Sequence, residues 1–231
     1  MLVEIYSDVV CPWCYIGKRR FETALAQFEG RDDVEVVWRP FQLDPDAPAT
    51  PSPVTDAYAR KFGGAAKAAE LIGHVTTLAA EDGLDFHLDE AQRSNTFDAH
   101  RVIWFARHQG GQDAVKERLL RAYFVEGRDV GDHEALADLA AEAGLDRDRV
   151  AALLESDEGR ADVADEIAQS AELGITAVPT FVFDGQWAVP GAQDPDTMLA
   201  VLRKVAATSA KSAERASVDA ADACADDTCE I

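Results

Sequence analysis

The sequence predicts an α/β fold that is interrupted by a large all-helical insertion. Residues 2–7, 11–29 and 34–39 show a strand, a helix and a second strand in succession, which favours a right-handed βαβ unit with a parallel sheet. From about residue 54 to residue 173 the pattern is helical throughout. Strand-like residues return at 180–183. We therefore expect the helical segment to be inserted into a smaller α/β domain.

The first helix is predicted by its apolar stripe. Phe21, Leu25 and Phe28 recur at intervals close to the 3.6-residue period of a helix. Residues 2–6 before it are mostly apolar and are typical of a buried strand. The helix is therefore expected to pack one face on the sheet.

The insertion contains several helical runs with recognisable starts and ends. Asp132 and Asp146 are suited to cap helix N-termini, and Gly144 and Gly174 are suited to end helices. Five helices are expected here. The first begins after Ser94-Asn95-Thr96 and ends at Arg107; the others are Gln112 to Phe124, 133–143, a short helix after Asp146, and 157–173.

The α/β pattern resumes after the insertion. Asp184-Gly185 lies between short apolar runs at 180–183 and 187–189, which predicts a β-hairpin. Asp194 followed by Pro195 indicates the start of a further helix. Beyond it the chain is rich in Ala, Ser and Asp, and we expect this tail to be flexible.

These elements divide the chain of 231 residues into three parts. We expect a discontinuous α/β domain at 1–53 and 174–205, a helical insertion domain at 54–173, and a C-terminal tail at 206–231. The length is ample for a packed core. No apolar run approaches the ~20 residues that a membrane span needs.

The charge of the chain excludes two classes of partner. With 22 basic and 43 acidic residues the formal net charge is −21. Nucleic acid and anionic membrane surfaces are therefore not expected as partners, because both require a positive surface. The N-terminus lacks a basic region followed by an apolar stretch, so we expect the protein in the cytoplasm. A dithiol in that compartment is usually catalytic or redox-sensing.

Cys11-Pro12-Trp13-Cys14 stands directly between the first strand and the first helix. The first turn of a helix presents unpaired N–H groups with a partial positive charge, which favours an ionised over a protonated sulfur at Cys11. Two thiols at this spacing in this position are typical of a reversible dithiol/disulfide pair. The motif therefore predicts thiol–disulfide chemistry.

Helix periodicity gives the two thiols different tasks. Cys14 is in line with the apolar stripe, whereas Cys11 is in line with Lys18 and Glu22 at its rim. We therefore expect Cys11 to be the accessible nucleophile and Cys14 the shielded resolving thiol. Cys11 would attack a partner's disulfide, and Cys14 would then break the mixed disulfide.

A second cysteine pair, Cys224 and Cys229, lies in the expected tail. The functional hypothesis makes it an auxiliary disulfide that exchanges electrons with the first pair; the alternative is two exposed thiols without a task. The acidic neighbours Asp226 and Asp227 disfavour thiolate formation there. A zinc site built from both pairs is disfavoured by their separation over almost the whole chain, so no metal is expected.

Several stretches are specific enough to carry a resemblance: Asp8 to Tyr15, Arg39 to Leu43, Ser94 to Thr96 with His100-Arg101, and Gly174 to Phe181. With the helical insertion, they resemble the DsbA-like thioredoxin superfamily over roughly residues 1–205. The closer resemblance is to its cytoplasmic FrnE-type branch, which is related to 2-hydroxychromene-2-carboxylate isomerases and kappa-class glutathione transferases. The resemblance implies a thioredoxin-like fold and a disulfide oxidoreductase or isomerase.

The resemblance also implies roles by position. Cys11 would attack and Cys14 would resolve. Pro179 would be a cis-proline that faces the redox pair, and Val178 would offer backbone groups to an extended substrate strand. The substrate-binding residues implied or proposed are Pro12, Trp13, Val178, Pro179, Thr180 and Asn95.

Some of these residues have simpler interpretations. Trp13 either docks apolar substrates or covers the sulfurs and so tunes their redox potential. Asn95 and His100 are candidates for the groove between insertion and sheet, but Asn95 is also suited to cap a helix, and His100 to make an ordinary hydrogen bond within the insertion.

Two other functions compete with protein disulfide exchange. The first is a glutathione-dependent isomerase or transferase of small aromatic compounds, whose known members typically have Ser at the position of Cys11. The second is a redox-sensing binding module without turnover. The expected partners are disulfide-containing or dithiol proteins, with glutathione as a candidate co-substrate and no bound cofactor. The physiological substrate, the direction of electron flow and the oligomeric state stay open.

Overall fold

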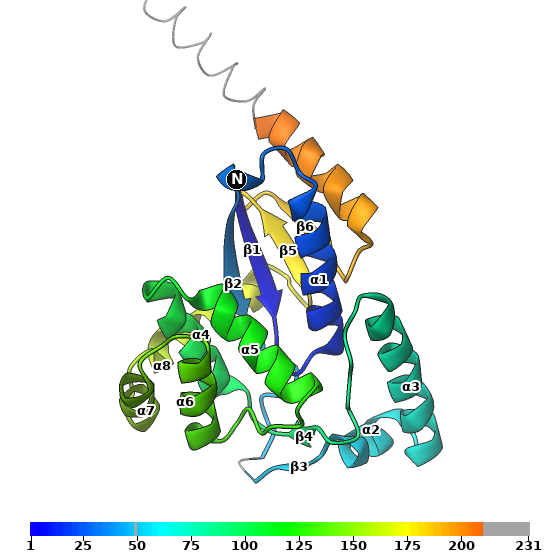
Figure 1. The fold of residues 1–231 in the computed structure, drawn as a ribbon, viewed down its shortest axis with the longest axis vertical. Helices are drawn as coiled ribbons and strands as arrows, with labels where there is room; N and C mark the ends of the chain where they lie inside the picture. Colours follow the sequence, from blue (N-terminus) through cyan, green and yellow to red (C-terminus); the bar gives the residue numbers. More distant parts are fainter. Residues whose placement is uncertain (49, 210–231) are drawn as a thin grey trace, which may run out of the picture.

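A computed structural model describes residues 1–48 and 50–209; Cys224 and Cys229 lie outside these residues. Its centre is a four-stranded sheet in the order β2-β1-β5-β6 (Figure 1). β1 pairs in parallel with β2, whereas the β1–β5 and β5–β6 pairs are antiparallel. The strands are β1 Leu2–Ser7, β2 Glu35–Pro40, β5 Thr180–Phe183 and β6 Trp187–Pro190. The predicted βαβ unit and the hairpin are both present.

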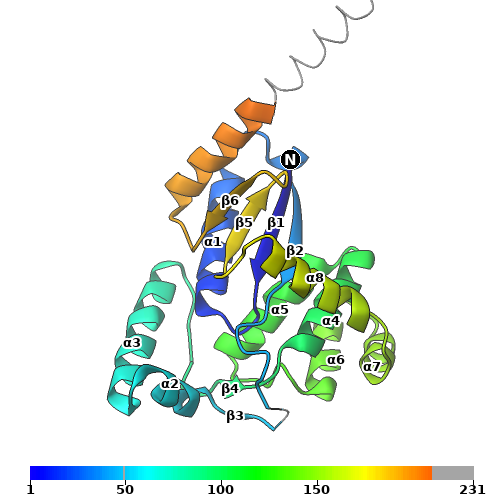
Figure 2. The same ribbon diagram turned by 180° about the vertical axis from the view of Figure 1, so that it is seen from behind.

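Helices cover both faces of this sheet. α1 (Pro12–Ala26) connects β1 to β2 and lies over one face, whereas α8 (Arg160–Glu172) lies over the other (Figures 1 and 2). Pro12 is the first residue of α1. The first N–H groups of a helix have no partner within the helix, so the N–H that proline lacks costs no helical hydrogen bond. The stripe residue Phe21 packs on Phe181 of β5, with ring centroids 5.4 Å apart. A last helix, at 195–209, follows β6.

The inserted helices gather around one end of the sheet. α2 and α3 lie on one side of that end and α4, α6 and α7 on the other, with α5 crossing near the end of β1 (Figures 1 and 2). Their bounds are α2 Val54–Phe62, α3 Ala65–Glu81, α4 Phe97–His108, α5 Gln112–Phe124, α6 His133–Glu142 and α7 Arg147–Glu155. The α/β class with a helical insertion is therefore confirmed.

The predicted capping residues start their helices as expected. The Asp132 carboxylate accepts a hydrogen bond from the Ala135 N–H at the start of α6, at 2.8 Å. Asp146 accepts in the same way from Arg149 in α7, at 2.9 Å. Each satisfies one of the N–H groups that a helix start leaves free.

The prediction of an unbroken helical segment at 54–173 is wrong in one place. β3 (Ser52–Pro53) and β4 (Gln92–Arg93) form a short antiparallel pair, and residues 82–96 contain no α-helix. Gly83, with φ of +75°, follows the end of α3. Strands of two residues are too short to show the alternation on which strand prediction depends.

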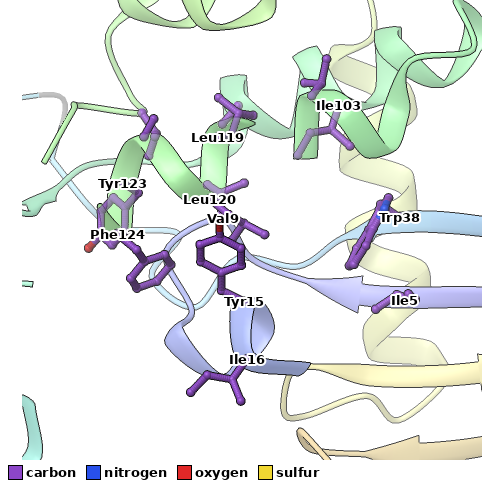
Figure 3. Packing of buried hydrophobic residues seen from close by; sticks show 14 of the residues in the cluster. Ile5, Val9, Tyr15, Ile16, Trp38, Ile103, Leu119, Leu120, Tyr123 and Phe124 are labelled. Atoms are coloured by element: carbon purple, nitrogen blue, oxygen red, sulfur yellow. The ribbon is translucent and has the colours of Figure 1, made fainter. Parts of the chain in front are cut away.

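One buried cluster joins the sheet to the insertion (Figure 3). Val9, Tyr15 and Leu120 of α5 belong to it, and the Phe86 ring stacks on the rings of Tyr15 and Phe124, with Phe86 and Phe124 centroids 4.5 Å apart. The α/β part and the insertion therefore share a core, and the domain boundaries given above stay a prediction. Among the described residues, no helix is long and apolar enough to cross a membrane.

Candidate active site

Cys11 is the N-cap residue of α1, and Cys14 lies within its first turn. The Cys14 N–H donates to the Cys11 carbonyl at 3.0 Å. The Cys11 side chain makes no capping bond to the helix; its Sγ donates instead to the Val178 carbonyl oxygen, with a sulfur–oxygen distance of 3.6 Å. The start of α1 and the segment before β5 are thus in direct contact, although 167 residues separate Cys11 from Val178.

The Val178–Pro179 peptide bond is cis, as the resemblance implies. Pro179 packs against α1 where Gly17 leaves room: a Cβ atom on Gly17 would lie 2.9 Å from the Pro179 Cγ. Thr180 begins β5, is buried, and donates through its hydroxyl to the Ala177 carbonyl at 2.8 Å. Cys11 therefore contacts the Val178 carbonyl, and Pro179 is buried against Gly17 of the same helix, whereas the Thr180 side chain is engaged locally.

Cys11 is less accessible than its place on the helix predicts. It is 3% exposed and Cys14 is 1% exposed, so the expected contrast between an open and a shielded thiol is wrong. Burial and the hydrogen bond with Cys11 raise the pKa of the Cys14 thiol well above its usual value. The exposed member of the motif is Trp13, at 39%, while Pro12 is half-buried.

A buried carboxylate organises the loop that carries Cys11. Asp8 is fully buried and accepts from the N–H groups of Val9 and Leu43, each at 2.8 Å. His100 Nε2 lies 3.3 Å from Asp8 Oδ1 and 3.1 Å from the Phe41 carbonyl. Burial disfavours the charged Asp8, but its bonds to His100 and Leu43 more than offset this and hold its pKa below the usual value. His100 therefore bonds outside the insertion, contrary to the interpretation above.

Sequence reasoning also missed Lys116, which is 1% exposed on α5. Its Nζ lies 5.5 Å from the centroid of the Trp38 ring. Burial lowers its pKa to about 8, against the opposing influence of Cys14, Asp8 and Cys11. The signal was present in the sequence: Lys116, Leu120 and Tyr123 share one helical face, and the other two are apolar.

A cavity of about 550 Å³ opens beside the motif. Pro12 and Val10 form one wall, and α2 supplies much of the remainder. Burial, followed by the influence of Cys11, raises the pKa of Tyr58 in this wall to about 12. The lining combines apolar, aromatic and cationic groups: Val10, Pro12, Leu43, Asp44, Val54, Ala57, Tyr58, Arg60, Lys61, Phe62, Arg93, Ser94 and Tyr123.

Asn95 lies in a different place. Its side chain donates to the Pro45 carbonyl at 2.9 Å and accepts from the Phe97 N–H at 2.9 Å, which holds the start of α4 against the loop after β2. It lines a second cavity of about 740 Å³ with His133 and Arg160. The N-cap residue of α4 is Thr96, so Asn95 bonds to the first turn from the position before the cap, and its role in substrate binding stays a prediction.

Among the described residues, no group of three His, Cys, Asp or Glu side chains is placed to hold a metal ion. The reactive groups described at this site are the two thiols and the titratable side chains near them. Both Cys11 and Cys14 are free cysteines.

Comparison with known proteins agrees with this geometry. Residues 2–203 match the family described as the DSBA-like thioredoxin domain. The uncharacterized protein YwbO of Bacillus subtilis is 32% identical over 197 residues, which is 84% of this chain and 92% of YwbO.

Solved structures show the same fold. A crystal structure named probable DsbA oxidoreductase SCO1869, from Streptomyces coelicolor, has a TM-score of 0.84 and 38% identity, covering 89% of each chain. The cytosolic disulfide reductase DsbM of Pseudomonas aeruginosa, solved with GSH, has a TM-score of 0.62. It is 21% identical and covers 88% of this chain and 98% of its own, so this second likeness concerns the fold.

Proposed function

The chain belongs to the DSBA-like thioredoxin domain family, a family of disulfide oxidoreductases, and from this premise we propose that Cys11 attacks and Cys14 resolves a substrate disulfide. The observation that carries the proposal is the contact of Cys11 Sγ, at the start of α1, with the Val178 carbonyl at 3.6 Å. A thiol held between a helix N-terminus and a backbone edge is placed to meet an extended chain.

The exchange proceeds in two balanced steps. The Cys11 thiolate attacks one sulfur of a substrate R–S–S–R′, forming Cys11–S–S–R and releasing R′–S⁻. The Cys14 thiolate then attacks the Cys11 sulfur, forming the Cys11–Cys14 disulfide and releasing R–S⁻. The substrate gains two electrons and the protein loses two; the same steps in reverse oxidise a dithiol.

The cavity beside Pro12 favours a substrate that is partly apolar and partly negatively charged. Leu43 and Phe62 give it exposed apolar surface, and Arg60 and Lys61 give it positive charge in an otherwise acidic chain, whereas Arg93 pairs with Asp44 of the same wall. We therefore propose protein segments or small disulfides that combine apolar groups with carboxylates. Glutathione, which carries two carboxylates, matches the positive charge of this wall as a co-substrate.

The test is turnover of a disulfide-bonded protein such as insulin with glutathione as reductant. Cys224 and Cys229 are first replaced by Ser, so that the measured turnover comes only from Cys11 and Cys14. Cys11→Ser is expected to abolish turnover, because the attacking sulfur is lost. Turnover that is unchanged in Cys11→Ser would refute the assignment.

Cys14→Ser separates the proposal from its competitor. In dithiol exchange this variant stops at a mixed disulfide with Cys11, which mass spectrometry detects as an added substrate mass. A glutathione-dependent isomerase would instead keep its activity without Cys14. The presence of both cysteines favours dithiol exchange.

Other features stay predictions. The FrnE-type assignment, the cytoplasmic location, an isomerase activity and the auxiliary role of Cys224 and Cys229 follow from the sequence interpretation. Peptide mapping of disulfides before and after mild reduction tests the tail pair directly.

A further inference from the structure

The cavity beside the redox motif has a buried floor and an exposed rim. Val54, Ser94 and Tyr123 in its wall are buried, whereas Leu43 and Phe62 are exposed. Its volume of about 550 Å³ falls within the range of about 300–1,000 Å³ that is common for small-molecule sites. A ligand in this cavity would therefore contact groups that are otherwise enclosed as well as groups at the surface.

Some polar side chains of this wall already have partners. Arg93 donates from Nε to the Asp44 carboxylate at 2.7 Å, so the two charges offset each other. The Ser94 hydroxyl donates to the Asp129 carboxylate. A ligand could bind to these groups only by displacing a bond that is already made.

The remaining four polar side chains of the wall have no such partner. Within residues 1–48 and 50–209, they form no hydrogen bond or ion pair; they are Tyr58, Arg60, Lys61 and Tyr123. Arginine and lysine only donate hydrogen bonds, and a phenol hydroxyl donates as well as accepts. The free side chains of this wall therefore match a ligand group that accepts hydrogen bonds and carries negative charge.

Tyr123 is the most enclosed of these donors. It is 2% exposed, and its ring lies edge-on to Phe124, with centroids 4.8 Å apart. In Figure 3 its hydroxyl points away from Leu120 and the centre of the core cluster. The oxygen is not one of the fully enclosed polar atoms of the described residues, so its accessible area faces the cavity that Tyr123 lines. A buried phenol usually has a partner, as Tyr15 has in Glu117 at 2.7 Å.

Tyr58 supplies a second phenol from α2. Its ring lies edge-on to Phe62, with centroids 5.5 Å apart and an interplanar angle of 88°. Burial raises the pKa of Tyr58 to about 12 and raises that of Tyr123 well above its usual value. Both hydroxyls therefore keep their protons at neutral pH and are available as donors.

We infer that Tyr58 and Tyr123 bind a carboxylate of the substrate disulfide in this cavity, and that Arg60 and Lys61 attract it at the rim. In the first exchange step the sulfur that bonds to Cys11 lies next to it and the departing sulfur lies farther out, so the group R of Cys11–S–S–R is beside the cavity. The favoured substrate is a low-molecular-weight disulfide whose group R carries a carboxylate. The inference rests on the proposed function, because it names the substrate class of that same site.

The experiment compares two disulfides as substrates of the full chain. Cys14, Cys224 and Cys229 are replaced by Ser, so that each release of thiol reports one attack by Cys11. 5,5′-Dithiobis(2-nitrobenzoate) carries a carboxylate on each half, whereas 4,4′-dithiodipyridine is neutral at pH 7. Stopped-flow absorbance at increasing disulfide concentration gives the half-saturating concentration and the limiting rate of attack for each compound.

Tyr58→Phe and Tyr123→Phe each remove one hydroxyl and keep the ring. Each is expected to raise the half-saturating concentration of the carboxylate disulfide about tenfold, the usual scale of a hydrogen bond to a charged group. The limiting rate, and the half-saturating concentration of the neutral disulfide, should change by less than about twofold, because neither depends on that bond. Tyr6→Phe is the matched control, since Tyr6 is buried in β1 and is not part of the cavity wall. It should change neither value.

Salt separates the enclosed donors from the cations at the rim. Lys61→Met should raise the half-saturating concentration of the carboxylate disulfide in about 0.02 M KCl but not in about 1 M KCl, because exposed charges are screened by salt. The effect of the two phenylalanine variants should persist at both concentrations, because enclosed groups are screened much less. An effect that disappears in 1 M KCl would place the carboxylate at the rim and overturn the assignment of the two phenols.

The inference is also overturned if both phenylalanine variants stay within about twofold of the parent for the carboxylate disulfide. An equal rise for both disulfides would overturn it too, because it would reflect lost packing rather than a lost bond to the carboxylate. If Tyr123→Phe does not fold, Tyr58→Phe alone decides, since Tyr58 is only partly buried. Absence of thiol release from either disulfide in the parent would instead overturn the proposed function, so the two failures are distinguishable.

Discussion

At the scale of single residues, the approach of α1 to Pro179 depends on one missing methyl group. Gly17 lies inside α1, where glycine costs about 0.5–1 kcal/mol relative to alanine. Here that cost is offset by contact, because a Cβ would lie 2.9 Å from Pro179 Cγ and 3.5 Å from Ala192 Cβ. The glycine therefore allows the redox helix and the proline segment to touch.

Gly17→Ala is expected to destabilise the protein and slow disulfide exchange. The added carbon forces Pro179 or α1 to shift, and overpacking of this kind costs about 1–3 kcal/mol, more than the helix gains. Gly73→Ala is the matched control: it lies in α3 with nothing within 4 Å of the added Cβ, so it should stabilise by about 0.5–1 kcal/mol. Urea unfolding of both variants measures the difference. Equal stabilisation by both would show that the contact with Pro179 is relaxed.

At the scale of elements, strong local sequence patterns were enough to predict most of the helices and strands. The stripe through Phe21 and the caps Asp132 and Asp146 predicted helices that are present. β3 and β4 were missed because a two-residue ladder owes its pairing to a partner 40 residues away rather than to its own pattern. The end of α7 was likewise not predictable from its own sequence, because the carbonyl groups at that end accept hydrogen bonds from a residue of α4.

That residue is Arg101, whose side chain is fully buried. Its Nη2 donates to the carbonyl oxygens of Leu153 at 2.6 Å and Ser156 at 2.7 Å, and its Nε donates to Glu158 at 3.1 Å. The last carbonyls of a helix have no partner within the helix, and a cation there is also favoured by the helix dipole. Arg101 therefore joins α4 to the turn between α7 and α8.

Arg101→Met is expected to destabilise by about 3–5 kcal/mol, because it leaves buried carbonyls without their donor and removes one of the partners of the Asp98 carboxylate. Arg149→Met is the comparison, since Arg149 is 42% exposed and pairs with the partly exposed Glu158, and it should cost about 0–1 kcal/mol. Denaturant midpoints at pH 7 give both values. Similar small losses in the two variants would contradict the structural role given to Arg101.

At the scale of the whole molecule, the site is assembled from segments that a linear reading does not bring together. The motif predicted the chemistry of Cys11 and Cys14, but the contact of Cys11 with the Val178 carbonyl joins segments 167 residues apart. The Asp8–His100 contact spans 92 residues, and neither partner shows a local pattern that predicts it. Lys116 was detectable in principle, because it interrupts an apolar helical face.

The net charge of −21 is also a property of the whole molecule, and it predicts the response to salt. Mutual repulsion of excess negative charge opposes the compact state, and salt screens it; the Debye length falls from about 30 Å at 0.01 M to about 3 Å at 1 M. Salt also weakens surface ion pairs such as Arg203–Glu29, but exposed pairs contribute little individually. Repulsion should therefore dominate, and the thermal midpoint should rise between 0.02 and 1 M KCl at pH 7. Calorimetry across this range, with sucrose at equal osmolality to isolate the ionic effect, measures it. A midpoint that falls with KCl would show instead that the ion pairs outweigh the repulsion.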